Sequence, residues 1–281
     1  MTEQEAEVKA VSESAEVKPR TFAVKRRKSR LRNANFVRLL SAVAFVVVWQ
    51  IVGMATTPLF LPTPMEVINA IPTVYTQGAL IANTTASLKI LSIGFLLSVA
   101  IGVPLGIVIG RYHFAELFSD IYINVFYALP AVALIPLLMV WFGIGDTSKI
   151  VIVFLSGFFP ILLNTGAGVH NIDHTLVEVA RSLGARESEL SRKIVLPGSV
   201  PFIMTGLRIA IGRAIVGLIV AELFLSLTGL GAMLAEYEAN FHTADYFVPL
   251  LIIAAISVFM TEAVKHIESR FSSWRVSPIN R

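Results

Sequence analysis

Residues 178 to 197 read EVARSLGARESELSRKIVLP, and this stretch decides how the rest of the chain is interpreted. It carries seven charged side chains in twenty residues and lies between two long apolar runs. Neighbouring helices of a bundle are usually joined by a few turn residues. A long, charged and helix-prone insertion therefore indicates a segment that projects from a bilayer and is held by something outside it.

An apolar stripe at the start of this insertion follows the helical spacing i, i+3, i+4, i+7: Leu176, Val179, Ala180 and Leu183. Gly184 predicts the end of the short helix, because glycine readily adopts the left-handed conformation of a helix C-terminus. A second helical piece is expected from about Glu187 to Val195, and the pair Leu196 and Pro197 is expected to break it. The stripe is either a docking surface for a partner or the apolar face of a hairpin that lies on lipid headgroups.

The rest of the 281-residue chain is strongly apolar, with 55% hydrophobic and only 15% charged residues. Six apolar runs are each about 20 residues or longer, which is enough to cross a hydrocarbon core of ~30 Å. They are 36–54, 86–110, 120–142, 148–168, 203–227 and 246–266. The sequence thus predicts an all-α membrane protein with six transmembrane helices. We expect residues 1–35 to be a disordered basic tail and residues 36–281 to form a transmembrane domain with a loop at about 169–202.

Basic residues lie mainly on one side of the predicted spans. Ten of the 23 Lys and Arg residues occur in the first 38 positions, whereas the loops 55–85 and 228–245 contain none. Lys149, at the edge of the fourth span, is the exception. The positive-inside rule then places both termini and the loop 169–202 in the cytoplasm. The first run is predicted to be an uncleaved span, because it does not fit the short apolar core and small-residue cleavage site of a signal peptide.

Two spans carry small residues at helical spacing, which lets helices approach closely in lipid. In the second span they are Gly94, Ser98, Gly102, Gly106 and Gly110, and in the fifth Gly206, Ala210, Ala214, Gly217 and Ala221. Prolines interrupt the second, third and fourth spans at Pro104, Pro130, Pro136 and Pro160. They suit a bundle that opens and closes, although ordinary kinks without function would also account for them.

Polar side chains within the predicted spans are few, and five are candidates for lining a pathway: Asn124, Tyr127, Asn164, Thr165 and Glu222. Glu222 either marks a transport route or lies near the outer end of the fifth helix, where a carboxylate costs little. The other four could instead form hydrogen bonds between helices. Arg208 and Arg213 in the fifth span can extend toward the cytoplasm or attract an anion.

Several chemistries are missing from the sequence. No GxxxxGK[ST] motif occurs, so the chain has no phosphate-binding loop for ATP, and any such energy must come from a partner. Cysteine is absent, and His170 and His174 without a third ligand do not predict a metal site. No spacing of serine, histidine and carboxylates predicts a hydrolase, so we do not expect an enzyme. The positive charge orients the chain and does not by itself indicate nucleic acid.

One family pattern fits the insertion across twenty positions. The matching residues are Glu178, Val179, Ala180, Gly184, Ile194, Leu196 and Pro197. They resemble the EAA loop of bacterial ATP-binding cassette (ABC) importer permeases, with Val179 where the family usually has alanine. LPTPMEV (61–67), WFGIGDTSK (141–149), GLRIAIGRA (206–214) and AELFLSLTGLG (221–231) are similar to the subfamily that serves nitrate, taurine, alkanesulfonates and bicarbonate.

The resemblance implies a type I importer permease fold in a bacterial inner membrane. It also implies a dimer of identical or related permeases, two ATPase subunits that bind ATP and Mg²⁺, and an extracytoplasmic solute-binding protein. In the family this loop, here including Leu183, holds the coupling helix that docks on the ATPase. Residues 64–78 are expected to form a helix that meets the binding protein or lies on lipid. Substrate identity stays open: a small solute is expected, and an anion is the candidate.

The sequence leaves two other functions open besides that of an importer permease. A secondary carrier driven by an ion gradient would use an intramembrane carboxylate, for which Glu222 is the candidate, but it leaves the insertion unexplained. A purely structural membrane scaffold would show no dependence on any solute.

Overall fold

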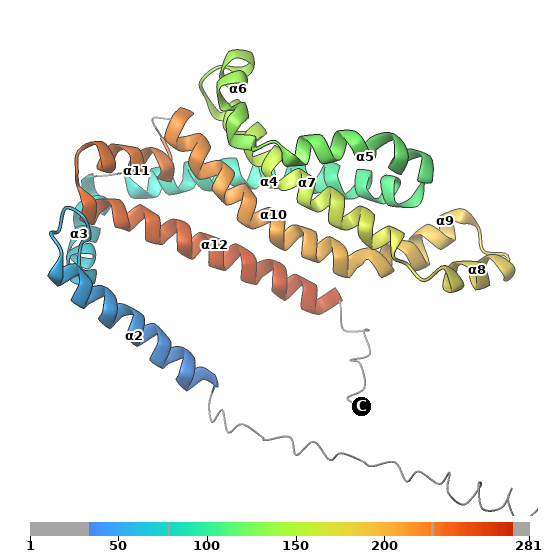
Figure 1. Ribbon diagram of the computed structural model, residues 1–281, viewed down its shortest axis with the longest axis horizontal. Coiled ribbons are helices and arrows are strands. Elements are labelled where there is room, and N and C mark those ends of the chain that lie inside the picture. The colour runs from blue at the N-terminus through green and yellow to red at the C-terminus, as the bar shows by residue number, and fades with distance from the viewer. Residues whose placement is uncertain (1–33, 78, 226–227, 272–281) are drawn as a thin grey trace, which may run out of the picture. The chain divides into compact units, whose positions relative to one another are not determined.

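The computed structural model describes residues 34–77, 79–225 and 228–271. The chain divides into two compact units, residues 1–45 and residues 46–281. The helix α2 (Ala34–Ala55) begins in the first unit and ends in the second, which holds all later elements (Figure 1). The predicted tail, except for its last two residues, lies outside the described residues.

Five helices in the described ranges are long and apolar enough to cross a membrane, and a bent helix pair makes six if it is counted as one span. The five are α2, α4 (Leu80–Arg111), α7 (Asp146–His170), α10 (Leu196–Leu225) and α12 (Thr243–Phe271). Each contains one of the predicted apolar runs, apart from the last two residues of the fifth run. The all-α prediction is confirmed.

The predicted span at 120–142 is interrupted at Pro130, as predicted, and the break is a sharp bend between two separate helices. The structure has α5 (His113–Ala128) and α6 (Ile135–Phe142), joined through the short 3-10 turn η1 (Ala131–Leu134) and bent by 85°. Proline disfavours helical backbone in the residue before it. Leu129, which precedes Pro130, is accordingly extended, with ψ of 126°. Pro136 lies in the first turn of α6, where a missing N–H costs nothing.

The helix α7 packs against both α4 and α10 (Figure 1). The small-residue stripes of α4 and α10 are contact faces, as predicted, and both face α7. A Cβ atom at Gly106 would lie 2.6 Å from Cβ of Thr165 on α7, and one at Gly206 would lie 2.9 Å from Cβ of Asn164. The hydroxyl of Ser98 donates to the carbonyl oxygen of Phe154 at 2.9 Å. Close backbone approach of this kind is what holds helices together in lipid.

Two short helices cluster with α12 at one end of this bundle. The helix α3 (Pro64–Gln77) buries Val67, Ala70 and Val74, which pack with Leu230 and Met233 of α11 (Leu230–Ala239) and with Val248 of α12. Thr63 and Glu66 cap α3 reciprocally, with Thr63 N donating to Glu66 Oε2 at 2.7 Å. The predicted helix at 64–78 is therefore present through Gln77, and this face of it is buried in protein and not on lipid.

The opposite end carries α8 (His174–Ser182) and α9 (Glu187–Leu190) (Figure 1). The predicted break at Leu196 and Pro197 is wrong, because α9, the π-helical turn η2 (Ser191–Val195) and α10 follow one another without interruption. Leu196 is helical, with φ of −62° and ψ of −49°, and its N–H bonds to the carbonyl oxygen of Ser191. The wider turn of η2 gives the Pro197 ring room that a regular helix would not.

Candidate functional site

The helix α8 has a defined start and end. The Asp173 carboxylate accepts a hydrogen bond from Thr175 N at 2.9 Å and so caps the first turn. At the other end Gly184 has φ of +81°, as the sequence predicted, and the following Ala185 N donates back to Ala180 O at 3.0 Å. Both ends are thus fixed by local hydrogen bonds, which makes α8 a rigid projection.

The apolar stripe of α8 is exposed. The exposed fractions of Leu176, Val179 and Leu183 are 57%, 54% and 82%. Ala180 is half-buried beside them, and Glu178 is exposed on the same helix. Leu176 and Val179 on this nine-residue helix and Leu183 at its C-cap form a compact apolar patch that water does not favour.

Glu187 ties α8 to the end of α4. Its carboxylate accepts a hydrogen bond from Arg181 Nε on α8 at 3.0 Å and also pairs with the guanidinium of Arg111, the last residue of α4. Arg111 Nη2 donates to the carbonyl oxygen of Glu187 as well, at 3.3 Å. The orientation of α8 relative to α4 is therefore set by one carboxylate and two arginines.

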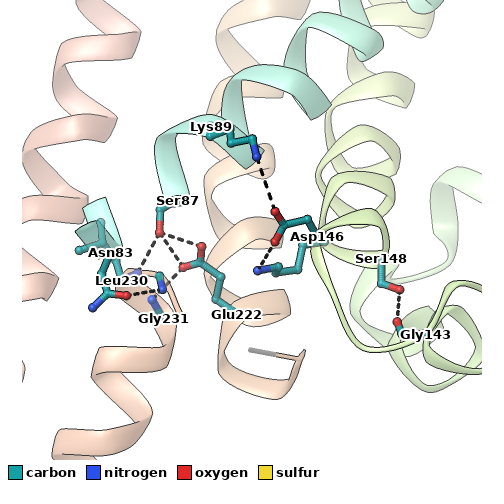
Figure 2. A network of polar contacts seen from close by, with 11 residues as sticks. Asn83, Ser87, Lys89, Gly143, Asp146, Ser148, Glu222, Leu230 and Gly231 are labelled. Atoms are coloured by element: carbon teal, nitrogen blue, oxygen red, sulfur yellow. Dashed lines mark hydrogen bonds and ion pairs between the residues drawn. The ribbon is translucent and has the colours of Figure 1, made fainter. Parts of the chain in front are cut away.

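At the other end of the bundle, a buried polar network joins α4, α10 and α11 (Figure 2). Ser87 Oγ donates to the carboxylate of Glu222 at 2.7 Å, and Glu222 Oε2 accepts from Gly231 N at 2.9 Å. Ser87 Oγ in turn accepts from Leu230 N at 2.8 Å, and Asn83 Oδ1 accepts from Gly229 N at 2.7 Å. Three side chains from other helices thus cap the first N–H groups of α11, where a carboxylate is electrostatically favoured.

Glycines make room for the Glu222 carboxylate. A Cβ atom at Gly229 would contact the carboxyl group, and one at Gly231 would lie 2.6 Å from Cβ of Glu222. Gly229 also has φ of +111°, which other residues rarely adopt. Glu222 is fully buried, so the glycines and the carboxylate form one packed unit.

A cluster of charged side chains, formed by Asp146 and two lysines, lies beside this network. Lys149 is buried, with its Nζ atom 3.0 Å from Asp146 Oδ1, and the exposed Lys89 lies 3.9 Å from Asp146 Oδ2 (Figure 2). Asp146 therefore offsets the charge of Lys149, which is an exception to the predicted distribution of basic residues.

A cleft of about 450 Å³ opens between α5, η1, α7 and α10. Its polar lining side chains include Tyr127, Ser156 and Arg213, and most of the other lining residues are apolar, among them Phe159 and Pro160. The guanidinium carbon of Arg213 lies 4.8 Å from the centre of the Tyr127 ring, in a cation–π contact. The cleft is large enough for a small solute.

Residues 102–273 match the family described as the binding-protein-dependent transport system inner membrane component. The chain belongs to this family. Relatives include a probable ABC transporter permease of Brucella abortus, 32% identical over 85% of this chain and 95% of its own length. The putative aliphatic sulfonates permease SsuC of Bacillus subtilis is 30% identical over 96% of this chain and 99% of its own length. The taurine permease TauC of Escherichia coli is 31% identical over 83% of this chain and 87% of its own length.

A solved structure of the methionine ABC transporter MetNI, in an inward-facing conformation, shares the fold of this permease. Its TM-score is 0.60 at 19% identity, over 69% of this chain and 97% of the other. The permease is therefore a multi-pass membrane subunit of an ABC importer with the type I fold. This membership favours the ABC function over an ion-driven carrier.

The structure separates the five side chains that the sequence proposed for a pathway. Tyr127 lines the cleft. Asn124 is exposed and bonds to Asp120 Oδ1 at 2.8 Å, while Asn164 bonds to the Pro160 carbonyl of its own helix at 2.8 Å. Thr165 is buried against Gly106, and Glu222 is buried in the α11 cap. Their roles in transport stay predictions.

The remaining residues of the loop pattern lie along one continuous helical run. Ile194 is half-buried in η2, and Leu196 and Pro197 begin α10 with Leu196 42% exposed. This run connects the loop to α10 without a break in the helix.

Sequence reasoning missed Ser87, Asn83, Asp146 and Glu187 as parts of these arrangements. Asn83 and Ser87 are four residues apart and so share a helix face, which is a weak signal that was present. Asp146 and Lys149, three apart in the segment WFGIGDTSK, gave another such signal. Nothing in the sequence indicated that Glu187 pairs with Arg111, because 76 residues separate them.

Proposed function

We propose that this permease carries a small sulfonate-type anion into the cytoplasm as half of a permease dimer of identical or related subunits. Two ATPase subunits drive it, and a solute-binding protein delivers the anion. ATP and Mg²⁺ bind to the ATPases and not to this chain. The aliphatic sulfonate and taurine permeases among the relatives support this substrate class, while nitrate and bicarbonate share the small oxyanion character.

The observation that carries the proposal is the exposed apolar face of α8. A patch formed by Leu176, Val179 and Leu183 is suited to a groove of a partner protein, because burying large apolar side chains there releases ordered water. A hairpin lying on headgroups would not need Glu187 to hold α8 in one orientation. A fixed orientation is what a docking helix requires.

Two routes lead from α8 to the spans. One passes through Glu187 and Arg111 into α4, and the other through α9 and η2 into α10. Both α4 and α10 pack on α7, so displacement of α8 moves these three helices together. We propose that this motion alternates the access of the solute pathway between the two sides of the membrane.

The charge distribution supports an orientation with both termini and α8 on the cytoplasmic side of a bacterial inner membrane. Lys149 does not oppose this orientation, since Asp146 offsets its charge. The α3 and α11 end then faces the binding protein. Protease protection of a C-terminal tag in sealed inside-out vesicles tests this placement, because the tag must be cleaved in them.

The test of docking is a pair of variants on the projecting loop. Leu183→Glu places a charge on the apolar face, and Ser188→Glu adds the same charge to an exposed serine of α9, outside that face. We purify the tagged full-length chain from its native membrane in mild detergent and identify the proteins that accompany it. A P-loop ATPase should accompany the unaltered chain and Ser188→Glu at equal yield.

Leu183→Glu should lose this ATPase and solute uptake together, while its amount in the membrane is unchanged. Recovery of the ATPase at full yield with Leu183→Glu would refute docking through α8. Purification of the unaltered chain without any ATPase, under conditions that preserve other complexes, would refute the proposed assembly.

A further inference from the structure

The residue that the established fold leaves without a role is Arg213. It lies near the middle of α10, a helix long enough to cross the membrane, and a guanidinium at that depth is costly. Arg208, five positions earlier, is held by Glu268 of α12. Within the described residues, no carboxylate forms an ion pair with Arg213. A charge retained at this depth therefore calls for a different partner.

The contact with Tyr127 holds the guanidinium without satisfying it. A cation–π contact uses the face of the guanidinium and leaves its N–H groups free to donate at the edges. Tyr127 belongs to α5 and Arg213 to α10, so the two halves of the cleft meet at this pair. The edge donors of Arg213 can then serve a molecule in the cleft.

The walls of the cleft restrict what that molecule can be. They are mainly apolar, with Phe126, Leu155, Phe159 and Val216 among the lining side chains. An apolar surround strengthens an ion pair with Arg213 and also accommodates a short hydrocarbon tail. None of the described lining residues is acidic, so an ammonium group in the cleft would have no countercharge.

We propose that Arg213 binds the oxyanion group of the transported solute in this cleft, and that the apolar walls take an uncharged aliphatic tail. The planar guanidinium can donate two parallel hydrogen bonds to neighbouring oxygens of a sulfonate. The cleft thereby favours a simple alkanesulfonate such as ethanesulfonate over zwitterionic taurine. This inference rests on the proposed transport of an anion and names the group that recognises it.

The test measures uptake of radiolabelled ethanesulfonate and taurine by native cells that express each variant from its own locus. Loss of a charge-assisted hydrogen-bonding site weakens binding by about tenfold or more. Arg213→Gln should therefore reduce ethanesulfonate uptake by at least that factor. Arg213→Lys should retain part of the uptake, because it keeps the charge but loses the paired donors. Tyr127→Leu removes the aromatic face that holds the guanidinium and should also reduce ethanesulfonate uptake.

Two further measurements distinguish binding of the solute by Arg213 from a purely structural role. Arg213→Gln should keep its amount in the membrane and its bound ATPase, and its ratio of ethanesulfonate to taurine uptake should fall toward one, because no guanidinium is left to repel the ammonium group of taurine. Arg208→Gln removes an arginine from the same helix outside the cleft and should leave that ratio unchanged.

Unchanged uptake and selectivity in Arg213→Gln, with active transport by the unaltered chain, would overturn the inference alone. A wild-type strain that takes up neither sulfonate would overturn the proposed substrate class and, with it, the inference. Loss of the bound ATPase in Arg213→Gln would assign the residue to assembly and also overturn the inference.

Discussion

Ser87 on α4 donates its hydroxyl hydrogen to Glu222 on α10 at 2.7 Å, across 135 positions of the chain. Both side chains are buried, and together they cap the N-terminus of α11. Glu222, the carboxylate that an ion-driven carrier would use, is thus engaged in holding a helix. It accepts hydrogen bonds from one hydroxyl and from one backbone N–H, that of Gly231.

Removal of the carboxylate should destabilise the permease. In Glu222→Ala, Ser87 and Gly231 N lose their buried acceptor, at a cost of about 1–3 kcal/mol, so thermal unfolding of the purified complex should occur at lower temperature. Glu222→Gln keeps an acceptor oxygen and should unfold close to the unaltered chain. Abolished uptake in a stable Glu222→Gln protein would contradict this structural role and revive the ion-coupled one.

Helix packing in the bundle should be sensitive to single added atoms. Gly106→Ala places a Cβ atom 2.6 Å from Cβ of Thr165, and overpacking of this kind costs about 1–3 kcal/mol. Gly212→Ala is the matched change, since nothing lies within 4 Å of its added Cβ atom. Thermal unfolding in detergent should separate the two variants, and equal midpoints would show that α4 and α7 do not approach as described.

The bridge made by Glu187 should matter for coupling more than for stability. Exposed ion pairs contribute less than about 1 kcal/mol, so Glu187→Gln should unfold almost normally. Solute uptake per ATP hydrolysed should fall in reconstituted complexes, because α8 loses its fixed orientation relative to α4. Lys193→Gln breaks the pair with Glu189 in the same loop and is the control. A matching fall in that control would assign the effect to loop charge in general.

The end of α8 should tolerate asparagine but not valine. Gly184 has φ of +81°, where a residue with a side chain costs about 1–2 kcal/mol and a β-branched residue more. Asparagine visits this conformation readily, so Gly184→Asn should keep the bound ATPase and Gly184→Val should lose it. No atom lies within 4 Å of a Cβ atom added at Gly184, so crowding of that atom does not confuse the comparison. Equal ATPase recovery from both variants would show that the turn is not needed for docking.

Much of the fold was predictable because its signals are local. Runs of apolar residues predict spans, and the spacing of Leu176, Val179 and Leu183 predicts the stripe of α8 whatever surrounds it. Gly184 predicts the helix end for the same reason, since the cost of its conformation belongs to the residue itself. The small-residue stripes of α4 and α10 also predicted contact faces, although not that both would face α7.

The effect of proline was predicted less well, because its preference against a helix competes with the conformation of the neighbouring turns. Pro130 ends α5 and turns the chain by 85°, whereas Pro197 is carried inside a helix because η2 widens the turn before it. Proline chemistry is the same at both positions. The neighbouring turns decide the outcome, and the identity of the proline does not reveal it.

The sequence by itself determined the apolar runs of the membrane-spanning helices and the apolar stripe of α8, because each rests on the order of residues within a short window. It also determined the membership of the permease family, through a match that spans residues 102–273. Only the tertiary structure decided that Glu222 caps α11 with Ser87, that Glu187 bridges Arg111 and Arg181, and that Arg213 meets Tyr127 in the cleft. These arrangements join residues that are far apart in the chain. Their partners are selected by the packing of helices, and packing depends on the whole set of side chains at once.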